Sequence, residues 1–249
     1  MPANEHLAAQ AASFGAAAAT YERGRPSYPA RAVDWLLPPG ARRVLDLGAG
    51  TGKLTRQLRG RGLEITAVEP SAGMRDQLTR SVADIRVLAG CAEDIPLDDG
   101  SVDVVLAAQA WHWVDPGRAV PEVARVLTGG GQLGLLWNVR DERESWVAQL
   151  GRIIHGDHRQ DMINSAPEVG PPFGPVERLD VGWRSHLTPD TLIDLAASRS
   201  YIITMPARER AGVLAGVRQL LDTHPALAGP AEIVLPYVTR CSRTFLATG

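Results

Sequence analysis

The 249-residue sequence predicts an α/β fold in one domain: a mostly parallel sheet of seven strands with helices on both faces. Three observations support this. Short apolar runs rich in β-branched residues alternate with amphipathic stretches along most of the chain. Residues 43–54 have the pattern of a strand, a glycine turn and a helix start. Hydrophobic residues make up 45% of the chain, which is enough for a sizeable core.

The predicted elements follow each other in a regular order. The strands are expected at 43–47, 64–69, 85–89, 102–108, 132–138, 176–186 and 233–247, the last broken near Pro236. The helices are expected at 30–37, from about 54 to about 60–62, 71–82 with Ser71 as N-cap, 119–127, 141–154, 189–199 and 207–223. Residues 128–131 are predicted to be a turn, and the loop and helices at 155–224 to form a cap over a substrate cleft.

The turn after the first strand is the most informative stretch. Glycines stand at alternate positions, Gly48, Gly50 and Gly52, so that the backbone can approach a ligand closely. The helix that follows begins with free N–H groups and a partial positive charge. Asp46 precedes the turn and suits a ligand that carries a positive amino group better than it suits a pyrophosphate. The stretch therefore predicts a site for a nucleotide-like ligand.

Two common phosphate-binding motifs fit this turn poorly. A dinucleotide fingerprint has its third glycine one residue later than Gly52, where this chain has Lys53. A P-loop requires Ser or Thr after that lysine, where this chain has Leu54.

A second acid marks the end of the next predicted strand. Glu69 lies 19 residues after Gly50 and is followed by Pro70, which stops the strand. In a βαβ unit, an acid about 20 residues further on binds ribose hydroxyls, because a carboxylate accepts hydrogen bonds from both. The spacing therefore predicts that Glu69 holds a ribose.

Together these residues resemble motif I of the class I methyltransferases that use S-adenosylmethionine, roughly apolar-apolar-D-x-G-x-G-x-G. The resemblance covers about residues 12–140, and the remaining third matches only in the order of its elements. It implies a Rossmann-like fold, binding of S-adenosylmethionine with S-adenosyl-L-homocysteine as product, and a cofactor-binding core at 41–140. The cofactor contacts that it implies at the turn and the second strand are Asp46, Gly48, Ala49, Gly50, Gly52, Glu69 and Pro70.

The segment 90–97 is similar to the family's G-D-A-E-x-L-P segment, which lies beside adenine. Cys91 stands where an aspartate is usual, so the adenine contact is expected from Ala92 and Glu93. Cys91 itself is expected to be a small packing residue.

Polar and aromatic residues follow the fourth predicted strand. Ligands of open α/β sheets lie at the carboxyl ends of the strands, which places Gln109, Trp111, His112 and Trp113 near the reacting end of the cofactor. Gln109 is expected to contact the cofactor, and Trp111 and Trp113 the acceptor. For His112, catalysis and simple packing are both open.

The first 30 residues resemble the lead of small-molecule methyltransferases of the trans-aconitate type, where it forms a lid over the cofactor. The resemblance gives that role to Phe14, Tyr21, Arg25 and Tyr28, with Tyr21 and Arg25 at the cofactor and Tyr28 at the acceptor. Residues 141–230 are expected to supply the cap on the substrate side and the C-terminal elements.

Composition narrows the choice of function. The formal net charge is −2, so that no overall field recruits nucleic acid or an anionic membrane. No apolar run is long enough to span a membrane, and the first residues lack a signal-peptide pattern, which predicts a cytoplasmic protein. The protein is expected to be a monomer or a homodimer. His155 and His158 lack further ligands at metal spacing, so no metal is expected.

The predicted activity is methyl transfer from S-adenosylmethionine to a small molecule, with a carboxylate among the candidate acceptors. Two other functions stay open: an NAD(P)-dependent dehydrogenase, and a non-enzymatic or RNA-associated member of the fold.

Overall fold

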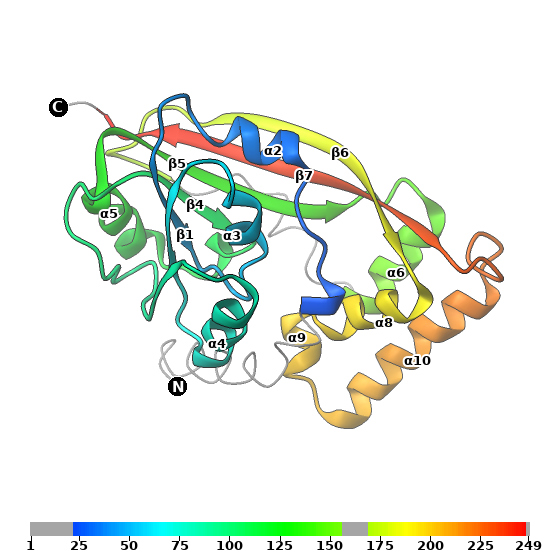
Figure 1. Ribbon diagram of the computed structural model, residues 1–249. Helices are drawn as coiled ribbons and strands as arrows, with labels where there is room; N and C mark the ends of the chain where they lie inside the picture. The colour runs from blue at the N-terminus through cyan, green and yellow to red at the C-terminus, as the bar shows by residue number, and fades with distance from the viewer. Residues whose placement is uncertain (1–21, 156–168, 248–249) are drawn as a thin grey trace. The chain divides into compact units, whose positions relative to one another are not determined.

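The computed structural model describes residues 22–155 and 169–247 (Figure 1). Its strands form one seven-stranded sheet in the order β3-β2-β1-β4-β5-β7-β6, which confirms the predicted fold class. The strands are β1 (Arg43–Leu47), β2 (Glu64–Val68), β3 (Arg86–Leu88), β4 (Val102–Ala108), β5 (Leu127–Arg140), β6 (Glu177–Leu187) and β7 (Ile233–Phe245). The pairs β1–β2, β1–β4, β2–β3 and β4–β5 are parallel, whereas Figure 1 shows β7 running opposite to β5 and β6.

The helices lie close to their predicted places. They are α2 (Ala30–Trp35), α3 (Lys53–Leu58), α4 (Ala72–Ser81), α5 (Pro116–Val126), α6 (Ser145–His155), α8 (Pro189–Ala197), α9 (Ser200–Ile203) and α10 (Ala207–Thr223), with a 3₁₀ turn η1 (Trp111–Trp113). Helix α9 was not predicted. Ser71 occupies the N-cap position of α4, but its side chain makes no capping hydrogen bond.

The chain divides into two compact units. Unit 1 comprises Met1–Pro26, Val139–Asn164 and Gly182–Val238, and unit 2 comprises Ser27–Asn138, Ser165–Val181 and Thr239–Gly249. The strands β5, β6 and β7 have residues in both. The predicted division into a lid, a cofactor-binding core and a cap stays a prediction.

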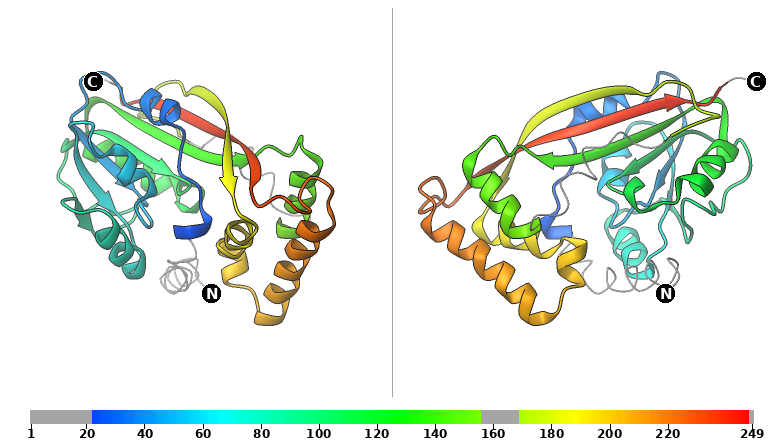
Figure 2. Two further views of the ribbon diagram at one scale, coloured as in Figure 1. Left: turned by 45° about the vertical axis from the view of Figure 1, so that its right-hand side comes forward. Right: turned by 180° about the vertical axis from the view of Figure 1, so that it is seen from behind.

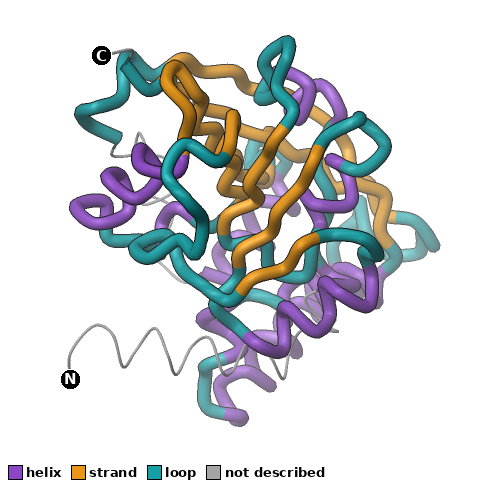
Figure 3. Tube along the Cα trace, turned by 60° about the vertical axis from the view of Figure 1, so that its left-hand side comes forward, coloured by secondary structure: helices purple, strands orange, loops and turns teal. Residues whose placement is uncertain are grey.

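Unit 2 has helices on both faces of its strands (Figure 3). Leu45 and Val105 point to the face that Val123 of α5 covers. Their neighbours Val44 and Val104 belong to the cluster under α2 and α3. Helices α2 and α3 lie in front of the strands in Figure 1, and α5 lies in front in the view from behind (Figure 2, right). The alternation of buried side chains along each strand thus fixes which helix covers which face.

Unit 1 has a separate helical core. Leu150 of α6, Leu192 of α8 and Leu220 of α10 pack with Leu235 of β7 in one buried cluster. The three helices lie alongside one another in both views of Figure 2.

Two boundaries differ from the prediction for identifiable reasons. The glycines at 129–131 do not form a separate turn but lie within β5, where the pairing with β4 shifts between Val102 and Val104. A glycine in the left-handed region, such as Gly130 with φ 75°, fits this irregularity. Strand β7 is continuous through Pro236. A proline lacks the backbone N–H but keeps its carbonyl, and the Pro236 carbonyl accepts a hydrogen bond from the Asp141 N–H at 3.0 Å.

Candidate functional site

The glycine turn connects β1 to α3 in a conformation that only glycine adopts easily. Gly48, Gly50 and Gly52 have φ values of 69°, 57° and 84°. A Cβ on Gly48 would come within 2.7 Å of the Ala110 Cβ, so that position is also closely packed. A Cβ on Gly50 would meet no heavy atom of the described chain within 4 Å. The backbone at Gly50 therefore faces an open space that a ligand can occupy.

Glu69 is held rigidly beside this turn. Its Oε2 accepts from the Gly50 N–H at 2.9 Å, and its Oε1 accepts from the Ser71 N–H at 2.9 Å. The residue is 7% exposed, and burial raises its pKa, against the lowering effect of the two backbone hydrogen bonds. Each carboxylate oxygen has two lone pairs, so both can accept a further hydrogen bond from a hydroxyl.

Asp46 lies behind the turn. It is 0% exposed, and its Oδ2 accepts from the Thr55 hydroxyl at 2.6 Å. Its Oδ1 is buried with no hydrogen-bond partner in the described chain. Burial raises the pKa of Asp46 from 3.8 to about 7, with the Thr55 hydrogen bonds lowering it and the Glu69 charge raising it further. An incompletely satisfied acid at this depth favours a positively charged ligand nearby.

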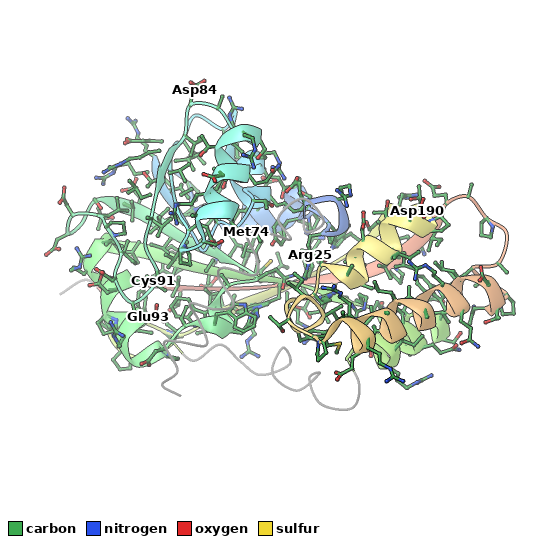
Figure 4. The ribbon with its side chains drawn as sticks, turned by 90° about the horizontal axis from the view of Figure 1, so that it is seen from below. Arg25, Met74, Asp84, Cys91, Glu93 and Asp190 are labelled. Atoms are coloured by element: carbon green, nitrogen blue, oxygen red, sulfur yellow. The ribbon has the colours of Figure 1, made fainter. Side chains whose placement is uncertain are left out.

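The segment after β3 folds back on itself at the predicted adenine position. The backbones of Cys91 and Asp94 bond to each other at 3.4 and 3.3 Å, and Ala92 is buried. Glu93 Oε1 accepts from the Asp115 N–H at 2.8 Å, which fixes the segment to the start of α5. Burial raises the pKa of the Cys91 thiol, in keeping with a packing role. Figure 4 labels Cys91 and Glu93 together on this segment.

Gln109 has the unusual backbone conformation of the site. Its φ is 56°, a region that a residue with a side chain rarely occupies. Its N–H donates to Leu136 O at 2.9 Å, and its side chain donates to Asn138 O at 3.3 Å. Such strain is concentrated at functional sites, which agrees with the predicted role of Gln109.

The three residues after Gln109 and Ala110 form η1, which brings aromatic rings together. Trp111 is 5% exposed and belongs to the core of unit 2. The rings of His112 and Trp113 lie 4.8 Å apart at 43°. The Trp137 Nε1–H donates to His112 Nδ1 at 3.4 Å. An accepting Nδ1 places the proton of a neutral imidazole on Nε2.

Sequence reasoning missed two residues that organise this part. Asn138 donates to Ser27 O at 2.9 Å and accepts from the Thr239 hydroxyl at 2.6 Å, and its carbonyl also accepts from Gln109. The second missed residue is Trp137, which donates to His112 Nδ1. The only sequence signal for these two residues was the presence of a tryptophan and a polar residue at the carboxyl end of an apolar strand.

The predicted lid residues have different surroundings. Tyr28 is 8% exposed and packs in the cluster that contains α2 and α3, with its N–H donating to Gln57 Oε1 at 3.0 Å. Arg25 belongs to unit 1, where it donates to Ser198 O at 3.2 Å. Tyr21 and Phe14 lie outside the described residues.

Just before Arg25, the chain packs closely on α8 in unit 1. A Cβ on Gly24 would come within 2.4 Å of Asp194 O, and the Arg23 Nε donates to Asp194 Oδ2 at 2.8 Å. Residues 23–25 are therefore attached to the carboxyl half of α8.

The described residues contain no group of three or more His, Cys, Asp and Glu side chains suited to a metal ion. His158 lies outside them. None of the described helices combines the length and apolar character that crossing a membrane requires.

Comparison with known proteins agrees with this geometry. Residues 45–135 match the family model described as a methyltransferase domain. An uncharacterized methyltransferase of Mycobacterium tuberculosis is 60% identical over 237 residues, covering 94% of this chain and 96% of the relative. A malonyl-[acyl-carrier protein] O-methyltransferase of Enterobacter lignolyticus is 35% identical over 149 residues, covering 56% of this chain and 59% of the relative.

Among solved structures, a putative type II methyltransferase from Anaeromyxobacter dehalogenans has the same fold. It is 24% identical, with a TM-score of 0.67, over 90% of this chain and 99% of the other. The glycine turn, the acid at the end of β2 and the near full-length relative lead to one assignment: the chain belongs to the class I S-adenosylmethionine-dependent methyltransferases.

Proposed function

We propose that this chain transfers a methyl group from S-adenosylmethionine to a small-molecule acceptor and releases S-adenosyl-L-homocysteine. The observation that carries the proposal is the pairing of an open glycine turn at Gly50 with a carboxylate, Glu69, that two backbone N–H groups hold in place. A preformed acceptor of this kind binds a diol with little loss of side-chain entropy.

The residues around the turn fit the parts of this cofactor. Glu69 would accept the ribose hydroxyls, and the backbone of Gly48–Gly52 would line the amino-acid moiety. Ala92 and Glu93 would contact adenine, and Gln109 would contact the cofactor near its reactive methyl group. Pro70 follows Glu69 in an exposed position and would border the adenosine.

Asp46 would act through its field, not by direct contact, because its side chain presents no surface to a ligand. Its charge lies behind the turn in a low-dielectric environment, where it would favour the cofactor's positive groups.

The cofactor supplies a methyl group that is already activated by the sulfonium. The chain therefore has to place the acceptor in line and exclude water. Hydrogen bonds to Leu136 and Asn138 fix the position of the strained Gln109, so this residue would form a rigid wall beside the methyl group. The half-buried Trp113 would supply apolar surface for the acceptor, and Trp111, which is buried in the core of unit 2, would hold η1 in place.

We further propose that the acceptor atom belongs to a carboxylate. Support comes from the resemblance to trans-aconitate methyltransferases and from the name of the malonyl-[acyl-carrier protein] relative. A carboxylate is ionised at neutral pH and needs no base. The hydrogen bond from Trp137 to His112 Nδ1 agrees, since it leaves a neutral His112 with its proton on Nε2.

The test combines binding with turnover. Calorimetry of the full chain should show binding of S-adenosylmethionine and S-adenosyl-L-homocysteine but not of NADH. A small-molecule extract incubated with the enzyme and methyl-labelled cofactor should then yield a labelled product whose label is released by mild base, as an ester's is. Absence of cofactor binding would overturn the proposal, and a base-stable label would overturn the carboxylate assignment alone.

A further inference from the structure

Unit 1 contains three arginines and a tyrosine to which the proposed function above assigns no role. Arg25 precedes α2, Arg140 ends β5, Arg199 joins α8 to α9, and Tyr237 lies in β7. We call these four residues the basic cluster. Arg25 donates to the carbonyl of Ser198, next to Arg199. Figure 4 labels Arg25 in this part of the chain.

The contact between β5 and β7 brings the other two members together. The Asp141 N–H donates to Pro236 O at 3.0 Å, and these residues directly follow Arg140 and precede Tyr237. The four side chains thus come from four separate segments of unit 1 and act on one another electrostatically.

Tyr237 contributes a buried hydroxyl to the basic cluster. The residue is 2% exposed, and its ring stacks on Trp183 with centroids 5.1 Å apart and planes at 17°. Its hydroxyl has no hydrogen-bond partner in the described chain. A buried polar group without a partner is costly, which makes this hydroxyl a candidate for bonding a ligand.

Arg199 contributes a buried guanidinium to the basic cluster. Its Nε is buried and has no partner in the described chain. Burial and the positive charges of Arg25 and Arg140 lower its pKa to about 9, against the raising effect of Tyr237 and Tyr201. Like charges gathered in this way repel one another, and a bound anion would relieve the repulsion.

We propose that the basic cluster is an oxyanion-binding site that takes a carboxylate or phosphate group. The planar guanidinium fork matches both groups, and a tyrosine hydroxyl donates to either. This inference does not depend on the proposed function.

The test uses the full chain with simple probes. Succinate and inorganic phosphate represent the two sources of an oxyanion, and neutral succinamide is the control. Tyr237→Phe removes only the hydroxyl and keeps the ring stack, and Arg199→Gln removes one charge. Arg210→Gln, at an exposed arginine of α10 in the same unit, is the matched control variant.

Succinate or phosphate should bind the wild type and raise its unfolding temperature, and succinamide should do neither. Tyr237→Phe and Arg199→Gln should weaken anion binding by about tenfold to a hundredfold, the loss expected for a hydrogen bond to a charged group. Arg210→Gln should bind as the wild type does. Tyr237→Phe should be at least as stable as the wild type without anion, because it removes an unsatisfied hydroxyl. The probe that binds more tightly identifies the class of anion, carboxylate or phosphate.

Two outcomes separate this inference from the proposed function. Normal binding of S-adenosylmethionine together with equal anion affinity in wild type, Tyr237→Phe and Arg199→Gln would overturn the anion site alone. Anion binding that depends on the basic cluster, in a chain that does not bind S-adenosylmethionine, would overturn the proposed function and leave the site standing.

Discussion

Replacing Asp46 by asparagine tests the electrostatics behind the glycine turn. The carboxylate is fully buried with one oxygen unsatisfied, and its pKa rises from 3.8 in the unfolded chain to about 7. At 1.36 kcal/mol per pH unit, this difference corresponds to about 4 kcal/mol. Because the folded pKa is the higher one, the stability linked to Asp46 is present below pH 3.8 and lost as the pH rises through about 7.

The wild type should therefore lose stability between pH 4 and pH 8 relative to Asp46→Asn, by about 4 kcal/mol over the full range and by more than half of that between pH 5 and pH 8. Urea unfolding at intervals across pH 5–8 measures the difference. Only the change of this stability difference with pH is interpreted, so any pH-independent effect of the asparagine side chain on stability cancels. Asp98→Asn, at an exposed loop position, is the control and should leave the curve unchanged. Parallel curves for the wild type and Asp46→Asn would refute the raised pKa.

The same reasoning applies to ligand binding. A positively charged cofactor near Asp46 should lower its pKa and release part of a proton at pH 7. The enthalpy of S-adenosylmethionine binding should then depend on the ionisation enthalpy of the buffer in the wild type, and less so in Asp46→Asn.

Three further predictions concern other parts of the molecule. Glu69→Ala should weaken S-adenosylmethionine binding by about 2–4 kcal/mol in calorimetry, since it removes bonds to a charged acceptor, with a smaller loss for Glu69→Gln; unchanged affinity in Glu69→Ala would contradict its role at the ribose. His112→Gln should lower kcat less than about tenfold and keep the pH profile, because no base is needed; a loss of about 10²–10⁴ with a vanished titration near neutrality would make His112 the base. Asp194→Asn should speed tryptic cleavage after Arg23 by about twofold to fivefold, the effect of an exposed ion pair, and Asp190→Asn on the same helix should not; equal rates in both would show that this ion pair does not hold the segment.

Much of the fold could be predicted because local signals and tertiary structure agree in unit 2. The apolar runs at β1, β2 and β4 each end at a polar or glycine residue, and the parallel sheet places those ends together. The glycine turn and Glu69 followed from the same reasoning, since spacing in a βαβ unit is a short-range property.

The features that could not be predicted depend on distant partners. Whether Pro236 breaks β7 is decided by the Asp141 N–H, almost 100 residues away in the chain. The partner of His112 is Trp137, from the next strand of the sheet. The basic cluster combines four segments, of which only Arg25 carried a signal, and that signal came from a family resemblance. Side chains assembled by tertiary contacts alone leave no periodicity in the sequence.

Gly24 bears on how this chain can vary during evolution. It is not part of the glycine motif, yet even a methyl group there would collide with the main chain at Asp194. Selection at this position should thus act on volume and not on chemistry. In a saturation library every replacement at residue 24, alanine included, should be depleted, whereas its neighbour Arg23, with a side chain that is 60% exposed, should accept most residues. Invariance at position 24 among relatives would then mark a packing requirement, and inferring a ligand contact from it would be a mistake.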